Sequence, residues 1–251
     1  MIYGVCTLTI VPMRATPDDP SEMVNQVLYG EVFKVPEKRK KWSRIRLLHD
    51  KYEGWIDNKQ YIEITEEEYA FAKAQPQKLI SDPVQFITTQ DSHLLTTVMG
   101  SAVHTLSLTK GLYDGPSAEG KKAKKALVDT ALLFIGAPYL WGGRTHFGID
   151  CSGFTQMVYR LNGYSLKRDA SQQATLGEAL SFIEESEPGD LAFFDNEEGN
   201  IVHVGIIMED NYIIHAHGEV RIDRLDHSGI YNAQQRAHSH KLRIIKRIIK
   251  K

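Results

Sequence analysis

Cys151 is the side chain in this sequence that is best placed for nucleophilic chemistry. It follows a stretch rich in glycine and aromatic residues, 139–150, and precedes apolar residues at helical spacing, Phe154, Met157 and Leu161. This pattern predicts that Cys151 lies at or near a helix amino terminus, where unpaired N–H groups and the helix dipole favour a thiolate. Because a lone cysteine is more often a small buried core residue, catalysis requires further partners.

Two histidines in apolar segments are the candidate partners of this cysteine. His203 lies within the run 201–207, and His215 ends the run 212–215. If these runs form adjacent antiparallel strands, the two histidines lie side by side and His203 faces Cys151. The three residues then form a Cys–His–His triad: the thiolate attacks a carbonyl carbon, His203 transfers the proton, and His215 orients His203. Spacing alone leaves two satisfied core histidines as the alternative.

The first 65 residues are predicted to form a small antiparallel barrel. They contain short apolar-alternating runs that are separated by turn residues, which is typical of such a fold. The basic run 38–41 is predicted to be a solvated hairpin tip. Cys6 lies in the first predicted strand and is expected to be a barrel residue that is not bridged to Cys151.

Residues 66–120 are predicted to form a connector helix and a second, reduced barrel. Thr65 and Glu68 have the spacing of a capping box, which marks a helix start. Short strands are expected at 84–88 and 101–108, although no strict internal repeat supports a second barrel.

Residues 121–251 are predicted to form an α+β domain, with helices first and a strand meander after them. Helical spacing is found in 125–135 and 154–161, and short β runs follow from residue 190 onward. The end of the chain, 242–249, mixes isoleucine pairs with cations. A closing strand is preferred over an amphipathic membrane helix because β-branched residues favour strands.

Composition excludes several classes of protein. The 251 residues include 30 Lys and Arg against 32 Asp and Glu, a net charge of −2, which gives no general electrostatic basis for binding nucleic acid or an anionic membrane. No apolar run approaches the roughly 20 residues of a membrane-spanning helix. The two cysteines have no zinc-ligand spacing, so we expect no metal and no cofactor. Residues 1–14 read as a strand rather than a signal peptide, which favours a cytoplasmic location.

Residues 125–235 resemble the NlpC/P60 family of papain-like cysteine peptidases, which cleave bacterial cell-wall peptides. The shared motifs are Tyr139-x-Trp141-Gly142-Gly143, Asp150-Cys151-Ser152-Gly153-Phe154, Arg168-Asp169-x-x-x-Gln173, Pro188-Gly189-Asp190-Leu191, His203-Val204-Gly205-Ile206 and Ile214-His215-Ala216. The resemblance implies a papain-like domain preceded by one or two SH3-like (SH3b) barrels. It also implies Cys151 as nucleophile, His203 as general base and His215 as the third polar residue.

The layout of the whole chain is similar to that of γ-D-glutamyl-L-diamino acid endopeptidases, also called dipeptidyl-peptidase VI. The resemblance implies a murein peptide substrate with a free amino-terminal L-Ala, from which L-Ala-γ-D-Glu is released. By position, Asp169 and the barrel residue Glu31 are expected to pair with the ammonium group, and Tyr52 to close that pocket. For Glu31 and Tyr52 the alternatives are an exposed strand charge and a barrel-packing tyrosine. Trp141, Asp150 and Ser152 are expected to line the cleft around D-Glu.

Two other functions remain open from the sequence. One is an inactive module that binds wall peptides, and the other is an amidase or acyltransferase of the same papain-like group. The intact set of Cys151, His203 and His215 counts against the inactive module. The main expectation is a metal-independent, monomeric, cytoplasmic peptidase that recycles murein peptides, with no nucleic-acid or membrane partner; the sequence does not identify the diamino acid.

Overall fold

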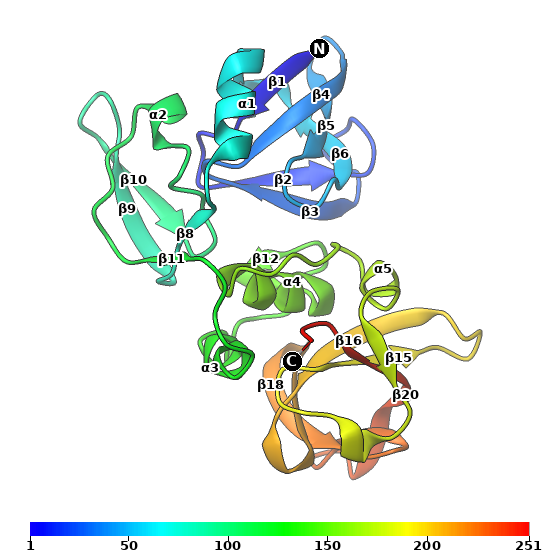
Figure 1. The fold of residues 1–251 in the computed structure, drawn as a ribbon. Helices are drawn as coiled ribbons and strands as arrows, with labels where there is room; N and C mark the ends of the chain where they lie inside the picture. The colour runs from blue at the N-terminus through cyan, green and yellow to red at the C-terminus, as the bar shows by residue number, and fades with distance from the viewer. Residues whose placement is uncertain (251) are drawn as a thin grey trace. The chain divides into compact units, whose positions relative to one another are not determined.

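The computed structural model describes residues 1–250 of the chain (Figure 1). Contacts between residues divide it into two compact units. Unit 1 holds Met1–Lys121 together with the short segment Trp141–His146. Unit 2 holds Lys122–Leu140 and the described residues from Phe147 onward. The three-segment division that we predicted from the sequence, at 65 and 120, stays a prediction.

The first part of unit 1 is an antiparallel sheet of seven strands in the order β3-β2-β6-β5-β4-β1-β7. The strands are β1 (Ile2–Val5), β2 (Ile10–Arg14), β3 (Met23–Leu28), β4 (Val32–Lys38), β5 (Trp42–Leu47), β6 (Glu53–Asp57) and β7 (Ile62–Ile64), with a 3-10 helix η1 (Asn58–Gln60) before β7. Alternate side chains of these strands point to one shared core, which includes Cys6, Met13 and Phe33. The predicted SH3-like barrel is confirmed.

The turns of this barrel follow from a few local residues. The basic run 38–41 lies at the tip of the β4–β5 hairpin, as predicted. Between β3 and β4 the chain turns at Gly30, whose φ is +76°. A Cβ atom at that position would lie 2.0 Å from the carbonyl oxygen of Ala102, so only glycine fits this turn.

The rest of unit 1 consists of short elements that pack beside the barrel. They are α1 (Glu66–Ala74), β8 (Lys78–Ile80), β9 (Val84–Thr88), β10 (Leu94–Val98), α2 (Leu106–Thr109) and β11 (Ser117–Glu119), and later in the chain β12 (Arg144–Thr145). The Thr65 capping box is present on both sides, which confirms the predicted helix start. The strand expected at 101–108 is wrong: β10 pairs with β9 instead, and α2 occupies the end of that range. β9 and β10 form one two-stranded ladder, and β8 and β11 form another.

Unit 2 places its longest helix against a seven-stranded antiparallel sheet of order β14-β20-β15-β16-β17-β18-β19. Its elements are α3 (Ala126–Leu132), β13 (Gly148–Ile149), α4 (Cys151–Leu161), α5 (Ala170–Gln173), β14 (Glu178–Leu180), η2 (Ile183–Glu185), β15 (Leu191–Asp195), β16 (Ile201–Ile207), η3 (Glu209–Asn211), β17 (Tyr212–His217), β18 (Glu219–Leu225), β19 (Gly229–Asn232) and β20 (Ala237–Arg247). The predicted α+β class is confirmed. So is the closing strand: β20 pairs with β15 and also with β19, which brings the sheet back on itself.

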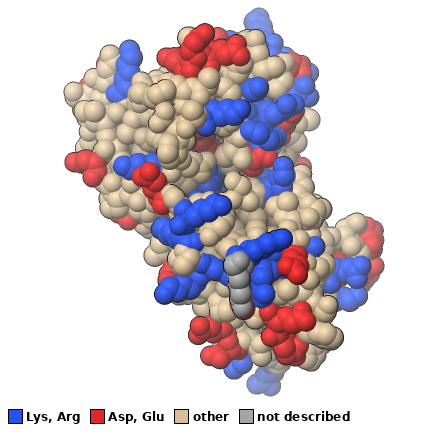
Figure 2. All heavy atoms as spheres, viewed as in Figure 1, with Lys and Arg blue, Asp and Glu red and all other residues tan. Residues whose placement is uncertain are grey.

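Charged side chains are mixed over the face seen in Figure 2, where both signs occur on the visible surface. This agrees with the net charge of −2. Among residues 1–250, no helix has the length and apolar character needed to cross a membrane. Both cysteines, Cys6 and Cys151, are free and buried.

Candidate active site

The amino terminus of α4 holds Cys151 in place. Asp150 is the N-cap residue: its backbone is extended, and its carboxylate accepts a hydrogen bond from the Gly153 N–H at 2.7 Å. Cys151 is therefore the first residue of the helix, as predicted. Every residue of α4 is buried, so the helix is fixed from all sides and the cysteine has little freedom to move.

A buried network of polar side chains supports this helix start. Arg168 donates two hydrogen bonds to the Asp150 carboxylate, at 2.9 and 2.6 Å, and a third to Ser152 Oγ at 3.0 Å. Gln173 Nε2 donates to the carbonyl oxygens of Ser152 and Lys167. The sequence motifs 150–154 and 168–173 are thus joined in space. Asp150 and Ser152, which we expected to contact substrate, also serve to fix the helix amino terminus.

The thiol of Cys151 is held in its neutral form. Burial, together with the negative charge of Asp150, raises the pKa of Cys151 to about 12. The N–H groups of Val204 and Ser152 and the cation of Arg168 oppose this shift but do not overcome it. The N–H groups at the helix amino terminus favour the thiolate, as the sequence predicts, but the cost of burying an anion exceeds this stabilisation. The nucleophile needs a base.

That base is supplied by the sheet. Cys151 accepts a hydrogen bond from the N–H of Val204, the residue that follows His203 on β16. His203 Nε2 lies 2.8 Å from His215 Nδ1 on β17, as the antiparallel strand model predicted. Gly205 lies opposite His215 in the register, and a Cβ atom at Gly205 would come within 2.9 Å of the His215 Cβ. The glycine therefore leaves the space in which the two imidazoles meet.

The hydrogen-bond chain continues to a carboxylate. His215 Nε2 lies 3.0 Å from Asp223 Oδ2 on β18, and Arg221 donates two hydrogen bonds of 2.7 and 2.9 Å to the same carboxylate. Burial acts to raise the pKa of Asp223, but the hydrogen bonds from His215 and Arg221 outweigh this effect and hold the pKa below its ordinary value. Asp223 is therefore an anion that is buried and doubly bound.

The direction of each proton follows from this chain. The ionised carboxylate of Asp223 only accepts, so His215 Nε2 carries a hydrogen and His215 Nδ1 is an acceptor. His203 then donates from Nε2, which leaves Nδ1 with its lone pair. Burial lowers the pKa of His203 well below its ordinary value, with His215, His240 and His217 adding to the shift. His203 is thus neutral and has one nitrogen ready to take a proton.

Three residues near the triad were not identified from the sequence. His240 on β20 stacks on the His203 ring, with 4.2 Å between ring centroids and 27° between planes. On β18, Arg221 and Asp223 are separated by one exposed residue, and Arg221 lies opposite His215 on the neighbouring strand. The pattern Arg-x-Asp on the strand after His215 was therefore the sequence signal that could have identified both residues. No comparable signal pointed to His240, because it reaches the site only when the last strand closes the sheet.

The remaining predicted substrate residues lie in different environments. Asp169 is half-buried and is the N-cap residue of α5, directly after Arg168. Its side chain makes no cap hydrogen bond. Trp141 belongs to unit 1, is 61% exposed, and donates from Nε1 to Glu22 at 2.6 Å. The structure leaves both residues as candidates for substrate binding.

Glu31 and Tyr52 both lie in unit 1, and Glu31 differs from the simple alternative that we considered. Glu31 is not an exposed strand charge: it is buried, and its carboxylate is bound by the guanidinium of Arg144 at 3.0 and 3.2 Å and by the Leu28 N–H. Tyr52 is partly buried and packs against the barrel core. No role was predicted for Arg144, because its position in a loop rich in glycine did not indicate burial.

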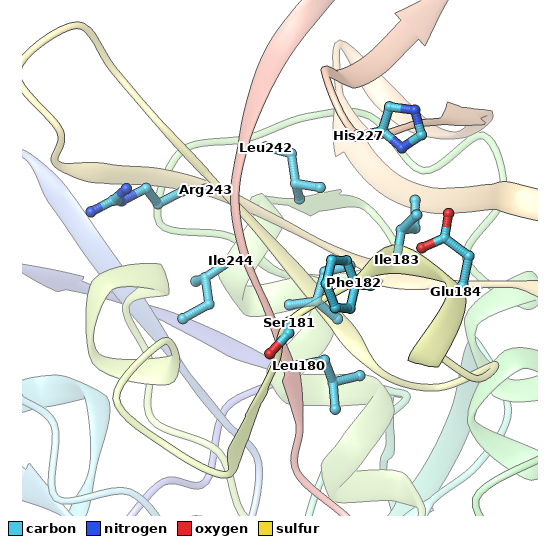
Figure 3. A pocket seen from close by; sticks show the side chains of 10 residues that line it. Leu180, Ser181, Phe182, Ile183, Glu184, His227, Leu242, Arg243 and Ile244 are labelled. Carbon is cyan, nitrogen blue, oxygen red and sulfur yellow. The ribbon is translucent and has the colours of Figure 1, made fainter.

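The pocket drawn in Figure 3 lies within unit 2. It has a volume of about 490 Å³ and is lined by the segment 180–184, His227 and the middle of β20, 242–245. Its lining combines apolar side chains, such as Phe182 and Leu242, with polar and charged ones, such as Glu184 (Figure 3). None of the triad residues contributes to it. Within residues 1–250 no group of three or more His, Cys, Asp or Glu side chains is arranged to hold a metal ion.

Comparisons with known proteins match both parts of the chain. Residues 136–239 match the NlpC/P60 family, and residues 13–60 match the bacterial dipeptidyl-peptidase Sh3 domain. A solved NlpC/P60 family protein from Bacillus cereus superposes with a TM-score of 0.80 over 99% of this chain and 100% of that one, at 19% identity. That likeness shows the fold.

Two curated relatives match the second part of the chain. The probable endopeptidase NlpC of Escherichia coli is 39% identical over 107 residues, which cover 42% of this chain and 69% of that protein. The γ-D-glutamyl-L-lysine dipeptidyl-peptidase of Bacillus subtilis is 40% identical over 103 residues, which cover 40% of this chain. The chain spans only about a third (34%) of the length of this second relative.

Proposed function

The chain belongs to the NlpC/P60 family of peptidases, and on that premise we propose that it is a cysteine peptidase which hydrolyses the bond between γ-D-Glu and a diamino acid in murein peptides. The observation that carries the proposal is the placement of Cys151 against Val204, next to a base that is hydrogen-bonded through His215 to Asp223. The name of the Bacillus subtilis relative and the match to a dipeptidyl-peptidase Sh3 domain support this substrate class.

The chemistry follows from the neutral thiol and the neutral imidazole. As the sulfur attacks the γ-carbonyl carbon, its proton passes to His203 Nδ1, and the new oxyanion is stabilised by the backbone N–H of Cys151 at the helix start. The His203 cation then gives this proton to the leaving amine of the diamino acid. Water next attacks the thioester with His203 again acting as base, which releases L-Ala-γ-D-Glu and restores the thiol.

A carboxylate that faces the free ammonium of L-Ala would restrict the enzyme to unblocked peptides. Asp169 is our candidate, because it follows Arg168 directly and is half-buried. A blocked amino terminus would leave that carboxylate without its cation, which is costly in a partly buried site. The proposed role is therefore the recycling of released fragments rather than the cleavage of intact wall.

The test is a cleavage assay read by mass spectrometry. L-Ala-γ-D-Glu-L-Lys and L-Ala-γ-D-Glu-meso-diaminopimelate are incubated with the protein, each beside its amino-acetylated copy. We expect release of L-Ala-γ-D-Glu from at least one free peptide and a rate lower by about 100-fold or more for its acetylated copy. Cys151→Ala should abolish release while its melting temperature and circular dichroism stay native. Equal cleavage of free and acetylated peptides would refute the dipeptidyl-peptidase specificity, and full activity of folded Cys151→Ala would refute the mechanism.

A further inference from the structure

The carboxylate of Asp223 lies outside the Cys–His–His triad but is hydrogen-bonded to its third member, His215. It is 7% exposed, lies 3.0 Å from His215 Nε2, and is held from the other side by both Nε and Nη2 of Arg221. A buried carboxylate is costly unless its charge is matched, so a purely structural role would be met by a neutral side chain.

We propose that Asp223 is a positioning residue of the active site: together with Arg221 it sets the tautomer of His215 and thereby directs the lone pair of His203 Nδ1 to the thiol. This inference rests on the proposed cysteine-peptidase function and extends it by one residue pair. Asp223 does not touch the reacting atoms, and it acts through His215.

The argument is one of donors and acceptors. A neutral imidazole has one N–H and one lone pair. In a chain of hydrogen-bonded histidines, each one therefore donates from one nitrogen and accepts at the other, so all hydrogen bonds of the chain run in the same direction. An acceptor-only group at the end of the chain puts the hydrogen on His215 Nε2, which makes His215 Nδ1 an acceptor and His203 Nε2 a donor. Without Asp223 the reverse arrangement becomes available, in which His203 Nδ1 carries the hydrogen and cannot take one from Cys151.

Arg221 fixes the carboxylate in this role. Its two donors bind both oxygens of Asp223, and Oδ2 is shared between Arg221 Nε and His215 Nε2. It also keeps Asp223 ionised. The other titratable groups around His215 are His203, His217 and His240, which are histidines and hence no substitute for an acceptor-only anion.

Asp223 also matters when charge develops. When His203 accepts the thiol proton it becomes a cation, and the hydrogen bond through His215 transmits that charge toward the carboxylate. Burial lowers the pKa of His215, and the carboxylate of Asp223 opposes part of this shift. Removing the carboxylate should therefore lower the plateau of kcat/KM and also move its acid limb to lower pH, because the histidine pair becomes harder to protonate.

The experiment compares Asp223→Asn with Asp226→Asn in the full chain. Asp226 also accepts a hydrogen bond from a histidine, His238, at 2.9 Å, but this pair is exposed and lies apart from the triad. We expect Asp223→Asn to lower kcat/KM about 10- to 100-fold, less than when the acid touches the base directly, and Asp226→Asn to leave it within twofold. Equal effects of the two substitutions would overturn the proposal.

Two further measurements separate positioning from simple loss of structure. When His215→Asn is already present, adding Asp223→Asn should lower kcat/KM by less than threefold, because the residue through which Asp223 acts is gone. An undiminished cost there would overturn the proposal. If Asp223→Asn folds poorly because Arg221 loses its anion, Arg221→Gln/Asp223→Asn removes both charges and should show the same loss of kcat/KM; native activity in that double variant would also overturn it.

A readout without substrate keeps this test independent of the proposed substrate. Alkylation of Cys151 by iodoacetamide at pH 7 needs only the thiol and its base, and it should be several-fold slower in Asp223→Asn than in Asp226→Asn. If the wild-type protein cleaves no murein peptide yet this difference is found, the positioning role stands and the proposed substrate fails. If peptides are cleaved and the two variants alkylate equally fast, the positioning role fails alone.

Discussion

Burial disfavours the charged form of both Cys151 and His203. The pKa of the thiol is raised and that of the imidazole is lowered, so Cys151 is a neutral thiol and His203 a neutral imidazole in the free protein. An ion pair would require moving a proton between them before substrate arrives, and the buried site stabilises neither charge enough. The proton transfer therefore belongs to the step in which the sulfur attacks the substrate.

This leads to a prediction about the pH dependence of alkylation. With a thiol pKa near 12, the thiolate fraction of Cys151 is small at neutral pH and grows with each increase in pH. Iodoacetamide labelling of the wild-type protein at pH 6 to 7 should therefore be slower than that of free cysteine, and it should speed up at alkaline pH, with Cys151→Ala as the blank. Labelling at pH 6 that is faster than that of free cysteine would show a preformed thiolate–imidazolium pair and contradict the neutral site.

At the residue scale, the sequence identified the reactive groups but not their ionisation. Helical spacing after Cys151 located it at a helix start, and apolar runs located the two histidines on neighbouring strands. The pKa of Cys151 depends on how completely the surrounding chain excludes water, and no local pattern contains that information. Asp223 was missed for a related reason, since a charged residue in a strand is usually solvated until its neighbours are known.

The hairpin of β16 and β17 is the element on which the base depends. His203 and His215 lie on the same face of the hairpin as Ile207 and Ile213, and Gly205 opposite His215 keeps the space between the two imidazoles open. Alternation along each strand was visible in the sequence, and so were the two strands themselves. The register between them was not, because it is set by the turn at 208–211, where Asp210 and Asn211 both have positive φ.

Gly205→Ala tests this element. The added methyl group would lie 2.7 Å from Ile213 Cδ1 and 2.9 Å from His215 Cβ, so β17 must shift and the hydrogen bond between the histidines must lengthen. We expect kcat to fall about 10-fold or more, and overpacking to cost about 1–3 kcal/mol of unfolding free energy.

The control for this variant is Gly218→Ala at the end of the same hairpin. Gly218 has a φ of +74° and open space around its Cβ position, so the substitution strains the backbone by about 1 kcal/mol without touching the imidazoles. Its kcat should stay near that of the wild type. If both variants lose kcat in proportion to their loss of stability, the role assigned to Gly205 is wrong.

At the scale of the whole molecule, a buried ion pair organises unit 1. Arg144 and Glu31 are almost fully buried, and Arg144 also donates from its backbone and side chain to Gln26. Gly142 packs so closely on β3 that a Cβ atom would lie 2.2 Å from the Met23 carbonyl oxygen. Several independent contacts thus hold the short segment 141–146 along β3. None of these contacts was predicted from the sequence.

Arg144→Met is predicted to destabilise unit 1 by about 3–5 kcal/mol, because it leaves the Glu31 carboxylate buried without its guanidinium. The three tryptophans, Trp42, Trp55 and Trp141, all lie in unit 1, so urea unfolding followed by tryptophan fluorescence reports on this unit. Arg46→Ala, which breaks an exposed pair with Glu53, should cost no more than about 1 kcal/mol. Equal costs for the two variants would show that the buried pair is not what holds the segment.

The segment 141–146 has a consequence for how such chains are assembled from modules. Residues on both sides of it belong to unit 2, so the polypeptide enters unit 1 a second time shortly before it reaches Cys151. A recombination event at a single junction near residue 121 would exchange the barrel but leave this segment behind, facing a surface to which Arg144 and Gly142 are not matched. A chimaera between family members should therefore carry both pieces from the same parent, and natural exchange of barrels is expected to be constrained in the same way.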